Sequence, residues 1–393
     1  MATDIIRPSP RPSPWRNPTI RGIVFQVLFV AAVVALGAFL VHNTVVNLRR
    51  QNIASGFGFL DREAAFGIGE SLIAYSPADT YGRAFVVGLL NTLNVAGLGI
   101  VLATILGIVM GIARLSANWL VRKLAQIYVE TFRNIPLLLQ LFFWWGLLRE
   151  SAPAPRQAWQ PLPDLFVSNR GLAFPVPNPD PAYGWMALAF CIGVVATIGI
   201  FRWARQRQAR TGEQFPTGWV GLGLVAGLPL AVFLLSGVPL TLDRPELKGF
   251  NFTGGHAVSP EFAALLLGLV IYTGTFIAEI VRAGILAVSW GQSEAAMALG
   301  LHPGQRMRLI VLPQALRVII PPMTSQYLSL TKNSSLAVAI GYPDLVSIAN
   351  TTINQTGQAV EGITMIMAVY LTISLIISAL MNVYNRAVAL VER

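Results

Sequence analysis

The chain has 393 residues, of which 54% are hydrophobic and only 12% are charged, and its mean hydropathy is +0.60. A soluble domain carries about twice that charged fraction, so this composition excludes a soluble enzyme or binding module. The net charge of +10 would suit a nucleic acid. Membrane sidedness accounts for it better, however, and we expect no nucleic-acid partner. One cysteine rules out an internal disulfide framework, and three widely separated histidines argue against a metal site.

Several apolar runs exceed the roughly 20 residues that a helix needs to cross a bilayer. We therefore predict an all-α polytopic membrane protein with about eight transmembrane helices. The predicted spans lie at 23–46, 84–112, 128–148, 183–202, 219–240, 261–288, 318–340 and 363–384. No small-residue cleavage pattern comes after the first run, so we interpret it as an uncleaved span rather than a signal peptide.

The composition of the segments between the spans divides the chain into five parts. The first is an Arg- and Pro-rich tail, which is expected to be disordered. The predicted parts are the tail at 1–22, the first span with a polar segment at 23–83, a first core part at 84–148, a loop with an inserted helix pair at 149–259, and a second core part at 260–393 that includes a polar loop at 289–317.

Lysine and arginine are unequally divided between the two sides of these eight spans. Eighteen lie on the side of the termini and nine on the opposite side, while Lys332 falls within a span. Cytoplasmic loops carry the excess of basic residues in membrane proteins. The sequence therefore predicts that both termini and the 289–317 loop are cytoplasmic.

Close helix packing is expected in the second predicted span. Its end carries Gly107 and Gly111 at the small-xxx-small spacing that lets two helices approach in lipid. The pattern is common, and on its own it indicates only a candidate contact.

The polar loop contains the signals of a short helix. Ser293 is placed to cap its N-terminus, Glu294 falls in the first turn, and Gly300 can end it in the left-handed conformation. Pro303 suits the first turn of a second helix, and Pro313 interrupts the helical stretch beyond it. These signals fit two interpretations equally well, an ordinary cytoplasmic loop helix and a docking element for a soluble partner.

The third predicted span begins with the string Glu-Thr-Phe-Arg-Asn-Ile-Pro-Leu-Leu-Leu-Gln. Glu130 and Arg133 are three residues apart on one helix face, so they can neutralise each other, and Gln140 ends the string. The chemistry alone slightly favours interfacial anchoring over a role in a substrate pathway.

The seventh predicted span has the most polar interior. At about 100° per residue, one arc collects Ser325, Ser329, Lys332 and Asn333. A lysine inside a span costs several kcal/mol unless it faces water or a partner, so the arc predicts a cavity lining or a subunit interface. A structural ion pair or a snorkelled lysine is the alternative for Lys332.

The sixth predicted span ends with a second pair of opposite charges. Glu279 and Arg282 are three residues apart, and we interpret them as an ion pair at a helix edge.

A phosphate-binding loop is absent from the sequence. Such a loop requires Gly-Lys-Ser or Gly-Lys-Thr, and none of the three lysines comes directly after a glycine. The chain therefore has no ATPase site of that type, and we expect it to bind no cofactor. The motifs of zinc proteases and of α/β-hydrolases are absent too.

Motif-level resemblance to a known family covers about 84–148 and 260–388. The polar loop has Glu294-Ala295-Ala296, then Gly300, Ile310 and Leu312-Pro313. This pattern resembles the EAA loop of ATP-binding-cassette importer permeases, and the third-span string resembles the signature of their polar amino-acid branch. The extra first span and the inserted pair are similar to those of the longer permease of general L-amino-acid importers. Where the family commonly has Lys-Asp-Thr-Ser-Leu, this chain has Lys-Asn-Ser-Ser-Leu at 332–336.

The resemblance implies a five-helix permease core in the bacterial inner membrane. It also implies a docking role for the loop and a path role for the polar residues. The implied coupling residues are Glu294, Ala295, Ala296, Gly300, Leu301, Leu312 and Pro313. The candidate translocation-path residues are Glu130, Arg133, Gln140, Ser325, Ser329, Lys332 and Asn333.

The same resemblance implies three kinds of partner. The partners are a second, non-identical permease, a cytoplasmic ATPase dimer that binds the ATP, and a periplasmic amino-acid-binding protein. The competing class is a secondary transporter or channel in which Lys332, Glu279 or Glu130 relays ions. A remote third class is an intramembrane hydrolase that uses Ser334 or Ser335 with Lys332.

Overall fold

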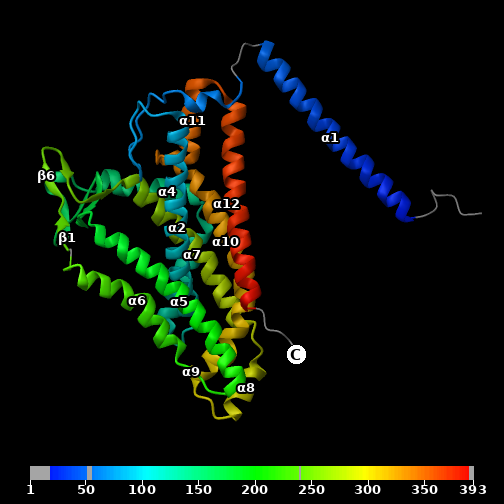
Figure 1. Cartoon of the computed structure of the whole chain (residues 1–393), viewed down its shortest axis with the longest axis vertical. Helices are drawn as coiled ribbons and strands as arrows, with labels where there is room; N and C mark the ends of the chain where they lie inside the picture. The colour runs from blue at the N-terminus through cyan, green and yellow to red at the C-terminus, as the bar shows by residue number, and fades with distance from the viewer. Residues whose placement is uncertain (1–17, 51–54, 239, 389–393) are drawn as a thin grey trace, which may run out of the picture. The chain divides into compact units, whose positions relative to one another are not determined.

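The computed structural model describes residues 18–50, 55–238 and 240–388 (Figure 1). Most of the predicted disordered tail lies outside this range. As expected, the chain is predominantly helical, and six of the described helices are long and apolar enough to cross a membrane, or seven if a bent helix pair is counted. The six are α1 (Pro18–Arg50), α2 (Tyr81–Ala113), α5 (Pro181–Thr211), α6 (Thr217–Leu235), α7 (Pro260–Leu286) and α12 (Ala359–Val388).

The predicted third span is not one continuous helix. It is divided into α3 (Trp119–Asn134) and α4 (Leu137–Gly146), and the break lies at Ile135 and Pro136. Proline has no backbone N–H and pushes the preceding residue toward extended geometry, which Ile135 adopts with φ −92° and ψ 126°. The prediction of one continuous spanning helix at 128–148 is therefore wrong.

The predicted seventh span also differs in detail. It is α10 (Leu312–Asn333), followed by a 3₁₀ segment over Ser334–Ile340 and then by α11 (Leu345–Thr356). These two divided segments explain why the number of long apolar helices differs from the eight spans predicted from hydropathy.

The chain forms two compact units, and the first consists of residues 1–90 and 345–373. Its core contains Phe59, Tyr81 and Leu345, which are almost fully buried. The side chain of Glu361 accepts a hydrogen bond from the Gly56 amide at 2.5 Å. The polar segment before α2 is therefore held by a hydrophobic core and by a half-buried hydrogen bond.

The second unit consists of residues 91–344 and 374–393 and is built around α7. Leu265, Leu269 and Ile277 of this helix are completely buried in the main hydrophobic core. The hydroxyl of Tyr128 on α3 donates to the carbonyl of Ile271 at 2.7 Å. Helix α7 thus connects the parts of the unit that carry the candidate sites.

The predicted close approach of α2 is confirmed within this unit. A Cβ atom added at Gly107 would lie 2.5 Å from Cβ of Ile277, and one at Gly111 would lie 2.7 Å from the carbonyl oxygen of Ala278. Both distances are too short for a real side chain, so the two glycines allow α2 to contact α7 directly.

The inserted segment between α4 and α7 contains short strands as well as the predicted helix pair. Helices α5 and α6 lie side by side (green in Figure 1), and Gly193 of α5 directly faces the backbone of Leu224. Strands β1, β2, β3 and β8 form an antiparallel sheet in that order, and β4 with β5 and β6 with β7 form two separate antiparallel pairs. The strands are β1 (Trp159–Leu162), β2 (Leu165–Ser168), β3 (Gly171–Phe174), β4 (Val176–Pro177), β5 (Leu242–Asp243), β6 (Glu246–Lys248), β7 (Asn251–Thr253) and β8 (His256–Val258).

Candidate functional site

The loop at 289–317 contains a two-turn helix, α8 (Trp290–Ala298). The helix begins earlier than the sequence signals indicated, because its N-cap residue is Ser289 and not Ser293. Ser293 lies inside the helix with its side chain 9% exposed, and Glu294 is in the middle rather than in the first turn. The predicted cap at Ser293 is therefore wrong, whereas the predicted helix exists.

Gly300 ends this helix as predicted. Its φ is +73°, which is the left-handed conformation that glycine adopts without steric cost. The Gly300 amide donates to the carbonyl of Met297 at 2.9 Å, and the Leu301 amide donates to that of Ala296 at 3.1 Å. These two bonds form the C-terminal capping motif in which a left-handed residue satisfies the last free carbonyls of the helix.

The side chains of α8 divide into a buried face and an exposed face. Ala296 is 1% exposed and faces inward with Ser293, whereas Glu294 lies on the exposed face. Trp290 and Leu299 have exposed fractions of 67% and 79%. The predicted coupling element therefore presents large apolar side chains next to a carboxylate, and the sequence reasoning missed both apolar residues.

The remainder of the loop leads into α10. Helix α9 (Pro303–Arg306) starts at the proline, as predicted, and a π-helical turn at Met307–Val311 precedes α10. Pro313 lies in the first turn of α10, where its missing N–H is tolerated. Leu301 is half-buried and Leu312 is exposed.

One face of α10 carries the predicted polar arc. Ser325, Ser329 and Lys332 are exposed and Asn333 is half-buried, while Leu330 is completely buried on the other side. Within the described residues, the ammonium group of Lys332 has no ion-pair partner. The structural ion pair considered for this lysine is thus absent from that part of the chain.

The two serines after Lys332 do not form a nucleophilic site. The Ser334 hydroxyl donates to the carbonyl of Thr331, and the Ser335 hydroxyl donates to that of Lys332, both at 2.7 Å. Hydroxyls that donate to the backbone of the preceding turn lack the adjacent base that an activated nucleophile needs. This geometry gives no support to the hydrolase alternative.

The charged residues of α3 have other partners than predicted. Glu130 accepts a hydrogen bond from the amide of Gln126 at 2.7 Å, and the guanidinium of Arg133 lies 5.1 Å from the ring centre of Phe276. The expected pairing of Glu130 with Arg133 is therefore wrong. Arg133 instead adds a contact between α3 and α7.

Gln140 is buried at the break between α3 and α4. Its amide nitrogen donates to the carbonyls of Phe132 at 2.8 Å and of Ile135 at 2.9 Å. Pro136 cannot supply the backbone N–H that a continuous helix would provide, and the glutamine side chain takes its place. Both of these partners lie at the α3–α4 break, so Gln140 supports the break rather than the polar arc of α10.

A cluster of three charges lies near the end of α7. Glu279 accepts hydrogen bonds from Arg282, three residues on, at 2.6 Å and 3.1 Å, and it is also ion-paired with Arg114, just beyond α2. The predicted pair of Glu279 with Arg282 is confirmed. Sequence reasoning missed Arg114, because its partner is 165 residues away.

Arg317 was counted as a basic loop residue but lies within α10. Its Nε and Nη2 atoms are buried and have no hydrogen-bond partner in the described part of the chain. Arg317 as a whole is half-buried, and two buried donors without an acceptor are costly.

The fold and the exposed α8 together define a class of protein, namely a helical membrane protein with a short exposed helix between two of its longer helices. Comparison with known proteins then gives the family. Residues 103–390 match the family described as "Binding-protein-dependent transport system inner membrane component", and the chain belongs to it. It is a membrane-embedded permease component of such a transport system.

Full-length relatives support this assignment. The chain is 54% identical to the putative amino-acid ABC transporter permease protein YhdX of Escherichia coli K12, over 96% of this chain and 97% of that protein. It is 53% identical to the general L-amino acid transport system permease protein AapQ of Rhizobium johnstonii, over 96% and 94% of the two chains. It is 43% identical to the glutamate/glutamine/aspartate/asparagine transport system permease protein BztB of Rhodobacter capsulatus, over 96% and 95%.

Proposed function

We propose that this chain is the permease subunit of an ATP-driven amino-acid importer and forms part of the path that the amino acid takes. The names of the three relatives support an amino acid as the substrate class. ATP binds to a separate subunit in this proposal, because the sequence has no phosphate-binding loop.

The exposed helix α8 is the observation that carries the proposal. Its buried face holds it against the chain, and its outer face offers Trp290, Glu294 and Leu299 to solvent. Tryptophan is enriched among the residues that contribute most to binding at protein interfaces, and Trp290 is the large exposed aromatic residue of this face. We assign this face to the ATPase, so that closure of the ATPase dimer moves α8 and, through the loop, α10.

A second, non-identical permease is the proposed membrane partner. Arg317 and Lys332 of α10 both lack an acceptor among the described side chains. An acceptor from a second subunit, or water in a shared path, would remove the cost of two isolated charges. The polar arc of α10 would then line the translocation path. Glu130 and Arg133 would lie at its entrance, and Gln140 would act indirectly by holding the α3–α4 break.

The remaining part of the proposal concerns orientation and delivery. The excess of basic residues favours cytoplasmic termini and a cytoplasmic α8 in the inner membrane. The β-rich segment between α4 and α7 would then face the periplasm, where an amino-acid-binding protein delivers the substrate.

Reconstituted transport tests the proposal. Proteoliposomes would contain this chain, the second permease and the ATPase, with ATP inside the vesicles and amino-acid-binding protein with labelled L-glutamine outside. We expect accumulation that needs all four proteins and ATP, and none with a non-hydrolysable ATP analogue. Accumulation without the ATPase, driven by an ion gradient, would instead establish the secondary-transporter alternative.

A further inference from the structure

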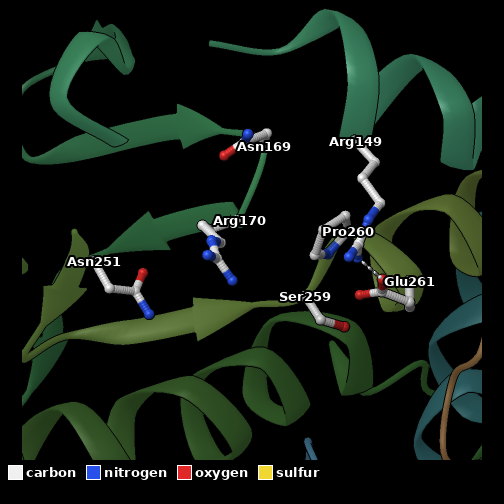
Figure 2. Close-up of a pocket in the computed structure, with 7 residues that line it drawn as sticks. All are labelled: Arg149, Asn169, Arg170, Asn251, Ser259, Pro260 and Glu261. Carbon is white, nitrogen blue, oxygen red and sulfur yellow. Dashed lines mark hydrogen bonds and ion pairs between the residues drawn. The ribbon is translucent and has the colours of Figure 1, made fainter. Parts of the chain in front are cut away.

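A polar cavity of about 430 Å³ lies where the inserted sheet meets the beginning of α7. Figure 2 shows its lining side chains, which come from the π-helical turn Leu147–Ser151 after α4, the turn between β2 and β3, the start of β7 and the beginning of α7. The lining residues are Arg149, Asn169, Arg170, Asn251, Ser259, Pro260 and Glu261. The volume falls within the range of small-ligand sites, and the cavity belongs to neither the α8 surface nor the polar arc of α10.

Glu261 is fixed within this cavity by one of its two carboxylate oxygens. Oε1 accepts from the guanidinium of Arg149 at 2.7 Å and from the indole N–H of Trp145 at 3.2 Å. Its side chain is 18% exposed. Both bonds use the same oxygen, so Oε2 of this oriented carboxylate remains available to a ligand among the residues that the structure describes.

Arg170 supplies the opposite charge on the other side of the cavity. Its side chain extends from the β2–β3 turn into the space between Asn251 and Ser259 (Figure 2). Among the residues that the structure describes, its guanidinium has no hydrogen-bond or ion-pair partner. The neighbouring Asn169 has a buried amide oxygen that also lacks a donor. The cavity therefore contains both hydrogen-bond donors, on Arg170, and hydrogen-bond acceptors, on Asn169 and Glu261, that are not used within the described residues.

We infer that this cavity binds a free amino acid, with the ligand carboxylate at Arg170 and the ligand ammonium group at Oε2 of Glu261. A guanidinium binds a carboxylate through two parallel hydrogen bonds, and a carboxylate oxygen is the matching acceptor for an ammonium group. A ligand with only one of these charges leaves the other side of the cavity unpaired. The inference deepens the proposed function, on which it rests, by adding a substrate site at the beginning of α7, apart from the polar arc of α10.

Equilibrium binding of labelled L-glutamine to the assembled transporter tests the assignment. The transporter would be held in lipid nanodiscs without ATP and without the binding protein. We expect Arg170→Gln and Glu261→Gln each to raise the dissociation constant about tenfold or more, because each removes a charge-assisted contact. Lys248→Gln is the matched control, since it removes one positive charge from a 71% exposed side chain of the same segment and should leave binding unchanged.

Two further measurements make the result specific to this cavity. Glutaramic acid and 4-aminobutanamide, which lack the ammonium and the carboxylate group respectively, should compete roughly tenfold less well than L-glutamine, or worse. L-Glutamine should also change the fluorescence of Trp145, which contacts Glu261, and Trp145→Phe should abolish that change. If Arg170→Gln does not assemble, Arg170→Lys replaces it in the binding measurement, because it keeps the positive charge but loses the two parallel hydrogen bonds of the guanidinium.

Several outcomes would overturn the assignment. It fails if the parent transporter does not bind L-glutamine at millimolar concentration, or if Arg170→Gln and Lys248→Gln bind it equally well. It also fails if Arg170→Gln weakens docking of the binding protein but leaves binding of L-glutamine unchanged. The carboxylate that contacts Arg170 would then belong to the binding protein and not to the amino acid. None of these results affects ATP-dependent uptake, so the proposed function would remain intact.

Discussion

Arg114, the first residue after α2, is ion-paired with Glu279 in the interior of α7. Their side chains are 15% and 27% exposed, and Arg282 donates to the same carboxylate. The pair links the end of α2 to α7 about two turns before α7 ends and the loop with α8 begins. The charged contact between α2 and α7 therefore lies close to the end of α7 from which the loop with α8 continues.

Glu279→Gln should destabilise the second unit. The substitution leaves two guanidinium groups close together with no counter-charge, and the loss should be about 1–3 kcal/mol in the free energy of unfolding, between the values for exposed and buried pairs. Thermal unfolding of the purified transporter measures it. The control is Glu213→Gln, which removes the partner of Arg207 in an exposed pair and should cost under about 1 kcal/mol. Equal melting temperatures for the two variants would contradict a structural role for Glu279.

Gly107→Ala should weaken the contact between α2 and α7. The new Cβ would lie 2.5 Å from Cβ of Ile277, and relief of such a clash requires a backbone shift that costs about 1–3 kcal/mol. Gly97→Ala is the control on the same helix, because a Cβ there meets nothing within 4 Å. Thermal unfolding of both variants gives the comparison, and an unchanged Gly107→Ala variant would mean that the two helices separate readily.

Local signals allowed most of the helices to be predicted. The stop at Gly300, the start at Pro303 and the small residues at Gly107 and Gly111 each act within a few residues, so the sequence alone reveals them. The start of α8 was misplaced because Ser293, a typical cap residue, precedes an alanine run, whereas the structure uses another serine, Ser289, as the cap and the helix begins at Trp290.

Features that depend on distant residues could not be predicted. The partner of Arg114 is separated from it by 165 residues, and the cavity around Arg170 needs the return of the chain at Ser259. The sequence did contain a signal for the break, because Pro136 is a residue type that interrupts helices. Hydropathy nevertheless favoured a continuous span, because the apolar run extends across it and the compensating bonds of Gln140 have no sequence signature.

Cysteine labelling tests the polar arc of α10. The native Cys191 is exposed, so it must first be replaced by serine. A cysteine at Ser329 should react with a small charged thiol reagent in at least one state of the transport cycle, because the side chain is exposed on the polar face. A cysteine at Leu330, which is 0% exposed, should not react. Similar labelling rates at both positions in every state would refute a defined polar face.

Reporter fusions test the orientation. Alkaline phosphatase fused at about residue 160 or 250 should be active, and a fusion at residue 208 should be inactive, because the excess of basic residues places the last position in the cytoplasm. Colony phosphatase assays with matched expression levels measure this. An active fusion at residue 208 would reverse the proposed sidedness of the inserted helix pair and, with it, the periplasmic position of the sheet.

Gly300→Val should impair coupling to the ATPase without preventing membrane insertion. Gly300 has φ +73°, and a Cβ there would meet no atom within 4 Å, so the cost is conformational rather than steric. A β-branched residue in this conformation costs on the order of 1–2 kcal/mol, and the alternative is loss of the bonds that end α8. The exposed side chains of Trp290 and Leu299 would then change their position relative to Glu294.

Gly304→Val is the matched control for this substitution, because Gly304 too lies in open space but has a negative φ. Co-purification of the ATPase and ATP-dependent uptake should both fall for Gly300→Val and stay near the parent values for Gly304→Val. If Gly300→Val retains the ATPase and transports normally, α8 is an ordinary loop helix and the docking surface must lie elsewhere on the chain.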